Sequence, residues 1–179
     1  MNESDVTDAL IRRYSVNGGN GARYAFASGV RSQAGFDARR TADFMAIDLW
    51  PSKRFELQGF EIKVSRSDWK QELKHPEKAG EFIPYVNRWW LVVPELVKPV
   101  ALREELPEDW GMMVVDGNGL VRVTHQAPRR NALPLSTTRM VALMRAVAQT
   151  AAYVARRTAQ AEFRELERYR AEKDEEHAW

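Results

Sequence analysis

Alternating apolar and polar positions predict a series of short β-strands in the first two thirds of the chain. The predicted strands cover residues 23–30, 42–50, 57–64, 88–93, 112–115 and 120–124. The second and third are separated only by a short stretch that starts at Pro51-Ser52, which predicts an antiparallel hairpin. The fourth, Arg-Trp-Trp-Leu-Val-Val, is apolar almost throughout, as in a strand that is buried on both faces.

Helical spacing of apolar residues predicts two helices among these strands. The first covers residues 3–14, with Ser4 as its cap. The second begins at Ser65, because the segment 65–68 reads as a capping box, and Trp69 and Leu73 are then expected to face the core. Pro76 ends or kinks this helix, and a further helical piece is expected over residues 78–82.

The second helix also predicts how two of the strands are paired. It lies between strands 57–64 and 88–93, so these strands are expected to run parallel through a right-handed crossover. The strands at 112–115 and 120–124 flank Asp116-Gly117-Asn118-Gly119, which is a strong hairpin signal. The predicted fold is therefore α/β, with an αβββαβ order and a mixed sheet.

The C-terminal part of the chain is predicted to be one long helix. Residues 136–176 contain neither Gly nor Pro, and apolar positions keep helical spacing until about Thr158. A helix of some 40 residues would be about 60 Å long, which exceeds the size of the domain. We expect its first half to pack on the domain or on a partner protomer, and its end to be solvated or coiled with a second copy. The predicted division is an α/β domain over 1–134 and the helix over 135–179.

Composition and charge narrow the chemistry. The 179 residues include no Cys and three His, which excludes disulfides and thiolate chemistry and makes a metal site built on carboxylates the natural candidate. The formal net charge is +2, and four Arg-Arg pairs are compatible with a polyanionic partner, although such pairs are also common on solvated faces. No secretory signal and no apolar run of roughly 18 residues is found, so we expect a cytoplasmic protein.

Glu61 and Lys63 are the strongest candidate catalytic residues. They are two positions apart in an apolar strand, so they share one face of the sheet, and burying both charges is costly unless they are paired or bind something. If the preceding hairpin turns near Lys53, Asp43 falls opposite this pair and Asp48 does not. Two carboxylates with the carbonyl of Ile62 suit a hard divalent cation and hence phosphodiester hydrolysis. The alternative is a structural ion pair on a sheet face.

These residues also carry a family resemblance. Asp43 followed by Glu61-Ile62-Lys63 and a helix resembles the Asp…(Asp/Glu)-x-Lys signature of the restriction-endonuclease-like nuclease superfamily, also written PD-(D/E)XK. Within it, residues 39–94 are similar to MmcB-like DNA-repair proteins and to phage-encoded relatives. The resemblance implies a restriction-endonuclease-like core in which Asp43 and Glu61 bind Mg²⁺ or Mn²⁺ and Lys63 is the catalytic lysine. No proline precedes Asp43, which departs from the superfamily signature.

Further residues are candidates for supporting roles. Asp68 is interpreted as part of the helix cap. One acid of the first helix could add a metal ligand, and the sequence does not choose among Glu3, Asp5 and Asp8. Contacts with DNA are expected from basic residues near the site, namely Arg66, Lys74, Lys78 and Arg40.

Three functions follow, in order of preference. The first is a Mg²⁺- or Mn²⁺-dependent deoxyribonuclease in phage or bacterial DNA repair, recombination or processing. The second is a nucleic-acid-binding or protein-interaction module on the same fold without turnover. The third is a structural subunit that assembles into a homo-oligomer through its C-terminal helix.

Overall fold

A six-stranded mixed sheet forms the centre of the molecule. The computed structural model describes residues 1–18, 21–35, 40–75, 77–97, 99–103 and 105–176. The strands, in an order that is the same in space and along the chain, are β3 (Tyr24–Arg31), β4 (Thr41–Asp48), β5 (Leu57–Ile62), β6 (Arg88–Pro94), β7 (Trp110–Val115) and β8 (Val121–His125). The pairs β5–β6 and β6–β7 are parallel and the other three are antiparallel, so the predicted mixed sheet is confirmed.

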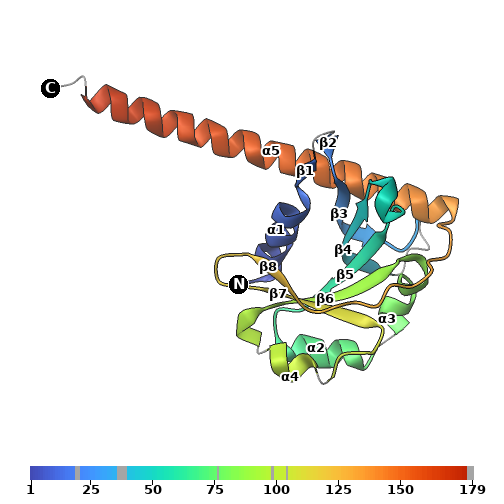
Figure 1. Cartoon of the computed structure of the whole chain (residues 1–179). Helices are drawn as coiled ribbons and strands as arrows, with labels where there is room; N and C mark the ends of the chain where they lie inside the picture. Colours follow the sequence, from blue (N-terminus) through green and yellow to red (C-terminus); the bar gives the residue numbers. More distant parts are fainter. Residues whose placement is uncertain (19–20, 36–39, 76, 98, 104, 177–179) are drawn as a thin grey trace.

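Helices surround this sheet, and the last one extends far beyond it (Figure 1). They are α1 (Glu3–Tyr14), α2 (Arg66–Leu73), α3 (Glu77–Gly80), α4 (Pro99–Arg103) and α5 (Thr137–Glu176). A small two-stranded ribbon joins β1 (Asn17–Gly18) to β2 (Gly21–Ala22), and single 3₁₀ turns occur at η1 (Pro51–Lys53), η2 (Ile83–Tyr85) and η3 (Glu95–Val97). The predicted order of helix, three strands, helix and strand is present as α1, β3, β4, β5, α2 and β6.

The core has two parts, one on each face of the sheet. On one face α1 packs Val6 and Leu10 against Phe44 and Phe60. On the other face Trp69 of α2 joins a cluster that includes Trp89 and Trp110 of neighbouring strands. The adjacent residues Trp89 and Trp90 therefore point to opposite faces, and both are buried, as predicted for the apolar run.

Two expectations about the helices are wrong in detail. The N-cap of α1 is Asn2 and not Ser4, because the Asn2 side chain accepts from the Asp5 amide (3.0 Å) while the Asp5 carboxylate accepts from the Asn2 amide (2.7 Å). Leu73 is 36% exposed and does not belong to the core. It is the last residue of a two-turn helix, and Glu72 takes the buried position beside Trp69.

The long helix α5 has the predicted length and a packed first half. Ala142, Ala146 and Thr150 are buried against the domain, and the Thr150 hydroxyl accepts from the backbone amide of Ser28 on β3 (3.1 Å). From residue 155 to 173 every side chain is exposed in the single chain. None of the helices in the described part of the chain has both the length and the apolar character that crossing a membrane requires.

Candidate active site

The β4–β5 hairpin brings Asp43 beside Glu61, as its register predicted. The pairs run from Ile47 with Leu57 to Phe44 with Phe60, so one further step along this register places Asp43 next to Glu61. The Asp43 carboxylate accepts a hydrogen bond from the backbone amide of Ile62 (2.7 Å), which fixes its side chain at the end of β5. Two acidic side chains are thus held at the same end of two neighbouring strands.

Lys63 lies directly after β5 and is held between two carboxylates. Its backbone amide donates to the carbonyl of Val92 on β6 (3.0 Å). Its ammonium group is 2.5 Å from Glu61 Oε1 and 3.1 Å from Glu72 Oε2. The Lys63, Glu61 and Glu72 side chains are 16%, 13% and 5% exposed, so the three charges form a compact, mostly desolvated network.

Glu72 is the member of this network that the sequence interpretation missed. It faces the sheet from α2, and its second carboxylate oxygen, Oε1, is buried without a hydrogen-bond partner. A signal was present, since Glu72 is three positions from the buried Trp69 and therefore lies on the same side of the helix. Leu73, one position later, was the more conventional choice for a core-facing residue.

Burial disfavours the simultaneous ionisation of Asp43 and Glu61. Burial raises the pKa of Asp43 to about 6, although the Ile62 amide and Lys63 act in the opposite direction. Burial and the charge of Asp43 raise the pKa of Glu61 to about 8, with Lys63 again opposing the shift. Ionising both of these buried carboxyl groups costs free energy, and a bound cation would offset that cost.

The same network keeps Lys63 charged. Burial alone would lower the pKa of the Lys63 ammonium, but the ion pairs with Glu61 and Glu72 outweigh it, so the net direction is upward. Lys63 is therefore a proton donor and a positive charge at neutral pH, rather than a free base.

The donor set fits a hard divalent cation that keeps part of its water shell. Within the described residues, no group of three or more His, Asp or Glu side chains is arranged to hold a metal ion. The protein ligands would thus be Asp43, Glu61 and the carbonyl of Ile62, and water or phosphate would supply the others, which is the manner in which Mg²⁺ is usually bound. The unpartnered Glu72 Oε1 is a further acceptor on the side of Lys63.

Asp43 is also open to solvent. It lines an open cavity of about 570 Å³ together with Glu3 of α1, Ser28 of β3 and Tyr153 of α5. Among the three acids of the first helix, Asp5 is used in the helix cap and Asp8 is paired with Arg157. Glu3 lines the same cavity as Asp43 and its charge contributes to the raised pKa of Asp43, so Glu3 stays the candidate among the three for an additional ligand.

Two other acidic residues lie outside the site. Asp48 is at the opposite end of β4, where it is 4% exposed and accepts from the Arg23 guanidinium. Asp68 accepts from the Ser65 hydroxyl (2.6 Å), and its backbone amide donates back to that hydroxyl (3.1 Å). Both arrangements agree with the prediction that neither carboxylate joins Glu61.

The basic residues expected to contact DNA differ in their exposure and in their ion pairs. Arg66 begins α2 and is paired with Glu105 (2.9 Å). Lys74 is exposed at the end of α2, and Arg40 is half-buried just before β4. The side chain of Lys78 lies outside the described residues. Contacts of these residues with DNA stay a prediction.

Comparison with known proteins gives a family and a fold. A family model described as "DNA repair protein MmcB-like" matches residues 10–163. Among solved structures, a protein of unknown function from Silicibacter pomeroyi is similar, with a TM-score of 0.52 and 19% identity over 78% of this chain and 82% of that chain. At this identity the structural likeness shows the fold alone. The chain has no significant match among curated proteins.

Proposed function

The chain belongs to the MmcB-like DNA repair protein family, and from this premise we propose that it is a Mg²⁺- or Mn²⁺-dependent deoxyribonuclease that hydrolyses DNA phosphodiester bonds. Membership of the family indicates a role related to DNA. The observation that supports cleavage is the convergence of Asp43, Glu61 and Lys63 at one end of the sheet, where burial raises the pKa values of the two neighbouring carboxyl groups.

The reaction adds water across one phosphorus–oxygen bond. The water oxygen bonds to phosphorus, the bond to the leaving alkoxide breaks, and the proton that the water loses reaches the leaving oxygen by way of the solvent. A divalent ion at Asp43 and Glu61 would make bound water more acidic and offset charge on the phosphate. The protein would contribute positions for that ion, because the Ile62 amide fixes Asp43 and the strand fixes Glu61.

Lys63 has a separate role in this proposal. Since its ammonium remains protonated, it would donate to a phosphate oxygen or to the attacking water and oppose the negative charge that develops in the transition state. Glu72 would act as a positioning residue, because its ion pair holds the ammonium at the end of β5.

The test is cleavage of linear, nicked, branched and single-stranded DNA with Mg²⁺ or Mn²⁺. We expect Asp43→Asn and Lys63→Ala each to lower kcat by about 100-fold or more, in the range known for groups that stabilise charge in a transition state. Lys70→Ala removes an exposed lysine of α2 and serves as the matched control. Equal cleavage by wild type and Lys63→Ala would contradict the site assignment.

A catalytically silent DNA-binding module is the second candidate. It is favoured by one observation, namely that the Lys63 ammonium is already engaged by two carboxylates, those of Glu61 and Glu72. In that case wild-type protein would bind DNA but leave every substrate intact with either metal, while Asp43→Asn would bind as tightly as wild type.

A further inference from the structure

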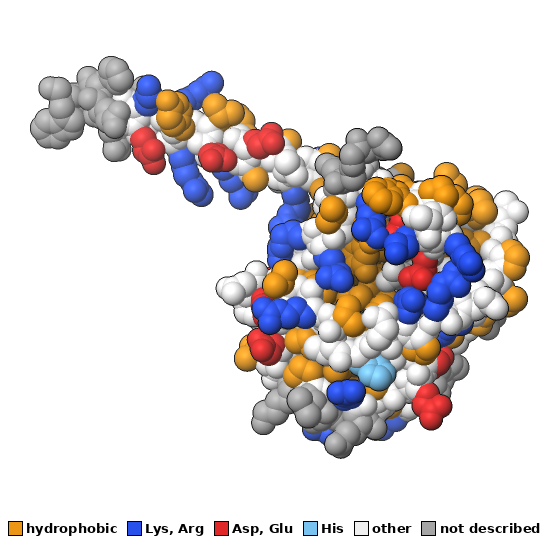
Figure 2. Space-filling view, in the orientation of Figure 1, with side chains coloured by type: hydrophobic (Ala, Val, Ile, Leu, Met, Phe, Trp, Pro, Cys, Tyr) orange, Lys and Arg blue, Asp and Glu red, His pale blue; other side chains and the backbone are white. Residues whose placement is uncertain are grey.

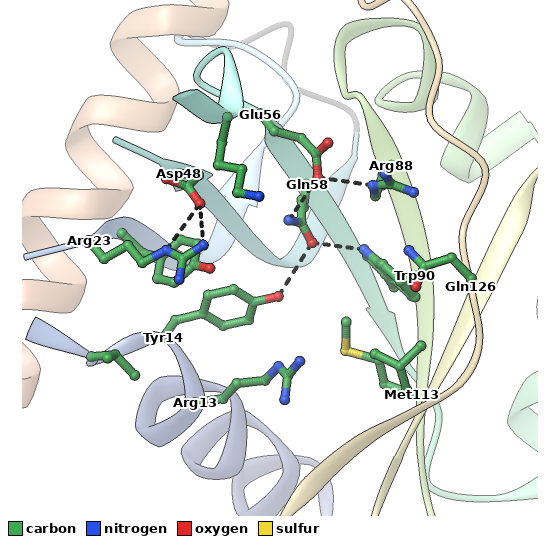
Figure 3. Close-up of a pocket in the computed structure, with 14 residues that line it drawn as sticks. Arg13, Tyr14, Arg23, Asp48, Glu56, Gln58, Arg88, Trp90, Met113 and Gln126 are labelled. Atoms are coloured by element: carbon green, nitrogen blue, oxygen red, sulfur yellow. Dashed lines mark hydrogen bonds and ion pairs between the residues drawn. The ribbon is translucent and has the colours of Figure 1, made fainter. Parts of the chain in front are cut away.

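A second hollow, of about 470 Å³, lies on the face of the sheet that α1 covers (Figure 3). Its lining includes Arg13, Arg23, Lys53, Gln58, Arg88 and Trp90. Figure 2 shows Lys and Arg side chains around a hollow on this side of the domain. These residues come from α1, from the position just before β3, from the β4–β5 loop and from β5 and β6.

This hollow is separate from the candidate active site. Gln58 and Glu61 are three positions apart on β5, so their side chains point to opposite faces of the sheet. They are also about 10 Å apart along the strand, at roughly 3.3 Å per residue. A ligand in the hollow would therefore not occupy the Asp43 site.

The acidic groups of the hollow are already neutralised by arginines. Asp48 accepts from Arg23 at 3.1 and 3.2 Å. Glu56 is paired with Arg88 (2.9 Å) and, from just outside the lining, with Arg129 (3.2 Å). Neither carboxylate is left to balance a further cation.

Two cations of the lining have no acidic partner within the described part of the chain. Arg13 donates to the backbone carbonyl of Val121 (2.9 Å) and forms no ion pair there. Lys53 lies in the β4–β5 loop, and its side-chain ammonium has neither a hydrogen bond nor an ion pair with any described residue, although its backbone amide donates to the Trp50 carbonyl (2.9 Å). The hollow thus has an excess of positive charge, which suits an anionic group such as phosphate.

The β4–β5 loop adds exposed aromatic surface beside this charge. Trp50 and Phe55 are 42% and 53% exposed, although large aromatic side chains are normally buried. The Trp50 ring lies 5.4 Å from the Arg23 guanidinium, which places it next to the hollow. Arg54 and Phe55 both have positive φ values (55° and 52°), a backbone conformation that non-glycine residues rarely adopt. Such strain is more common at functional sites than elsewhere.

The floor of the hollow presents a fixed amide. Gln58 Oε1 accepts from the indole of Trp90 (3.0 Å) and from the hydroxyl of Tyr14 (3.4 Å), and Gln58 Nε2 donates to Glu56 (3.1 Å) (Figure 3). The second Nε2 hydrogen has no partner among the described residues. It is a fixed donor of the kind that can recognise the edge of a base.

We propose that this hollow and the β4–β5 loop form a binding site for an unpaired nucleotide, with its phosphate at Arg13 and Lys53 and its base stacked on Trp50. Uncompensated cations next to exposed aromatic rings are the combination by which proteins bind single-stranded nucleic acid. The nucleotide could be part of a DNA strand or be a free nucleotide. The site requires neither a metal nor cleavage, so it goes beyond the proposed nuclease activity.

The test is the binding of 5′-fluorescein-labelled (dT)₁₂, measured by fluorescence anisotropy in EDTA. We expect Trp50→Ala to weaken binding by about tenfold, the scale of one base–aromatic stack. Lys53→Ala should weaken binding and reduce the slope of log K against log salt by about 0.7, because one phosphate contact is lost. Circular dichroism melting would verify that both variants are folded.

Matched controls come from exposed residues elsewhere. Lys70→Ala, on α2 at the other face of the sheet, and Met144→Ala, an exposed residue of the first half of α5, should bind (dT)₁₂ as wild type does. If Trp50→Ala and Lys53→Ala also bind like wild type, the proposed site is wrong. Because EDTA prevents cleavage, an inactive nuclease that still shows these losses would count against the nuclease proposal alone.

Competition with dTMP identifies the source of the nucleotide. Displacement of (dT)₁₂ by millimolar dTMP, weakened by Lys53→Ala, would show that the hollow accepts a free nucleotide. Failure of dTMP to compete, together with the expected losses in the two variants, would show that the site recognises a nucleotide within a strand.

Discussion

At the scale of single residues, the position of Lys63 depends on Glu72. The 3.1 Å ion pair with Glu72 complements the one with Glu61 and keeps the ammonium at the end of β5. Both acids raise the pKa of Lys63, so removing one of them must make the lysine easier to deprotonate.

We therefore predict that Glu72→Gln lowers kcat of the proposed cleavage by about tenfold, with little change in KM, since the lysine would act mainly in the transition state. The basic limb of the pH–rate profile should also move to lower pH. A merely structural role would leave that limb in place, and a profile with unchanged pH dependence would count against Glu72 as a positioning residue.

A second prediction concerns stability and pH without metal. The folded-state pKa values of Asp43 and Glu61 are raised to about 6 and about 8, above their ordinary values of 3.8 and 4.5. The folded protein thus binds more protons than the unfolded chain, and the free energy of unfolding falls as pH rises from about 4 to 8.

Glu61→Gln should flatten this fall and be more stable than wild type at pH 8 in EDTA, by about 1–2 kcal/mol. Urea unfolding at pH 6 and pH 8 measures the free energy of unfolding of both proteins, with Glu165→Gln on the exposed end of α5 as the control. Addition of Mg²⁺ should reverse the trend for wild type, because cation binding requires both carboxylates to be ionised. A wild-type protein that gains stability between pH 6 and 8 in EDTA would contradict the assigned burial effect.

The sequence predicted the positions of single site residues correctly where one rule of strand geometry decided them. Strand alternation placed Glu61 and Lys63 on one face, and the hairpin register selected Asp43 over Asp48. The sequence interpretation missed Glu72. Glu72 and Leu73, three and four positions after Trp69, both lie near the same side of the helix, and only the packed structure shows which of them is buried.

At the scale of secondary-structure elements, β5 depends on a glycine for its packing. A Cβ at Gly59 would lie 2.3 Å from the Trp89 ring on the parallel neighbour β6. Gly59 also shares its face of the strand with Glu61, so this close approach sets the path of the strand that carries the site.

Gly59→Ala is therefore predicted to reduce the free energy of unfolding by about 1–3 kcal/mol through overpacking. Gly80→Ala on α3 is the control, because nothing lies within 4 Å of its added Cβ. Chemical denaturation compares the two, and a Gly59→Ala protein as stable as wild type would show that Trp89 moves at no cost.

Helix caps and turns that involve only neighbouring residues predicted correctly where some helices and strands begin and end. The Ser65 cap set the start of α2, and the Asp116 loop produced the β7–β8 hairpin, in which Asp116 accepts from the amides of Asn118 and Leu120. The strand with Glu61 ends at Ile62, two residues earlier than predicted, because Asp43 takes the Ile62 amide and the pairing with β4 stops at Phe60.

At the scale of the whole molecule, the end of α5 is a long, exposed extension. It projects away from the domain (Figure 1), and it exposes Phe163, Leu166 and Tyr169 at 60%, 52% and 57%. Exposed large hydrophobic residues on one helix favour association with another surface. The homo-oligomer expected from the sequence stays a prediction, and this stripe is its natural interface.

We predict that wild-type protein self-associates in sedimentation equilibrium and that Phe163→Glu combined with Leu166→Glu is monomeric. Ala161→Glu combined with Ala171→Glu adds the same charge on a different side of the helix and should associate as wild type does. If the wild-type protein is monomeric at all concentrations, the predicted homo-oligomer is wrong.

The hollow at Gln58 shows the limit of sequence interpretation at this scale. Its charged residues, among them Arg13, Lys53 and Arg88, are far apart in the chain and form no motif. They meet only because α1, the β4–β5 loop and β6 converge on one face of the sheet, which periodicity alone does not predict.

Crystals soaked in MnCl₂ test whether a divalent cation binds at Asp43 and Glu61. We predict an anomalous difference peak between these two carboxylates, within about 2.0–2.3 Å of their oxygens, the range expected for hard divalent ions. The peak should be absent in Asp43→Asn crystals that are treated in the same way. A wild-type crystal with Mn²⁺ bound elsewhere and no peak at this site would contradict the proposed cation site.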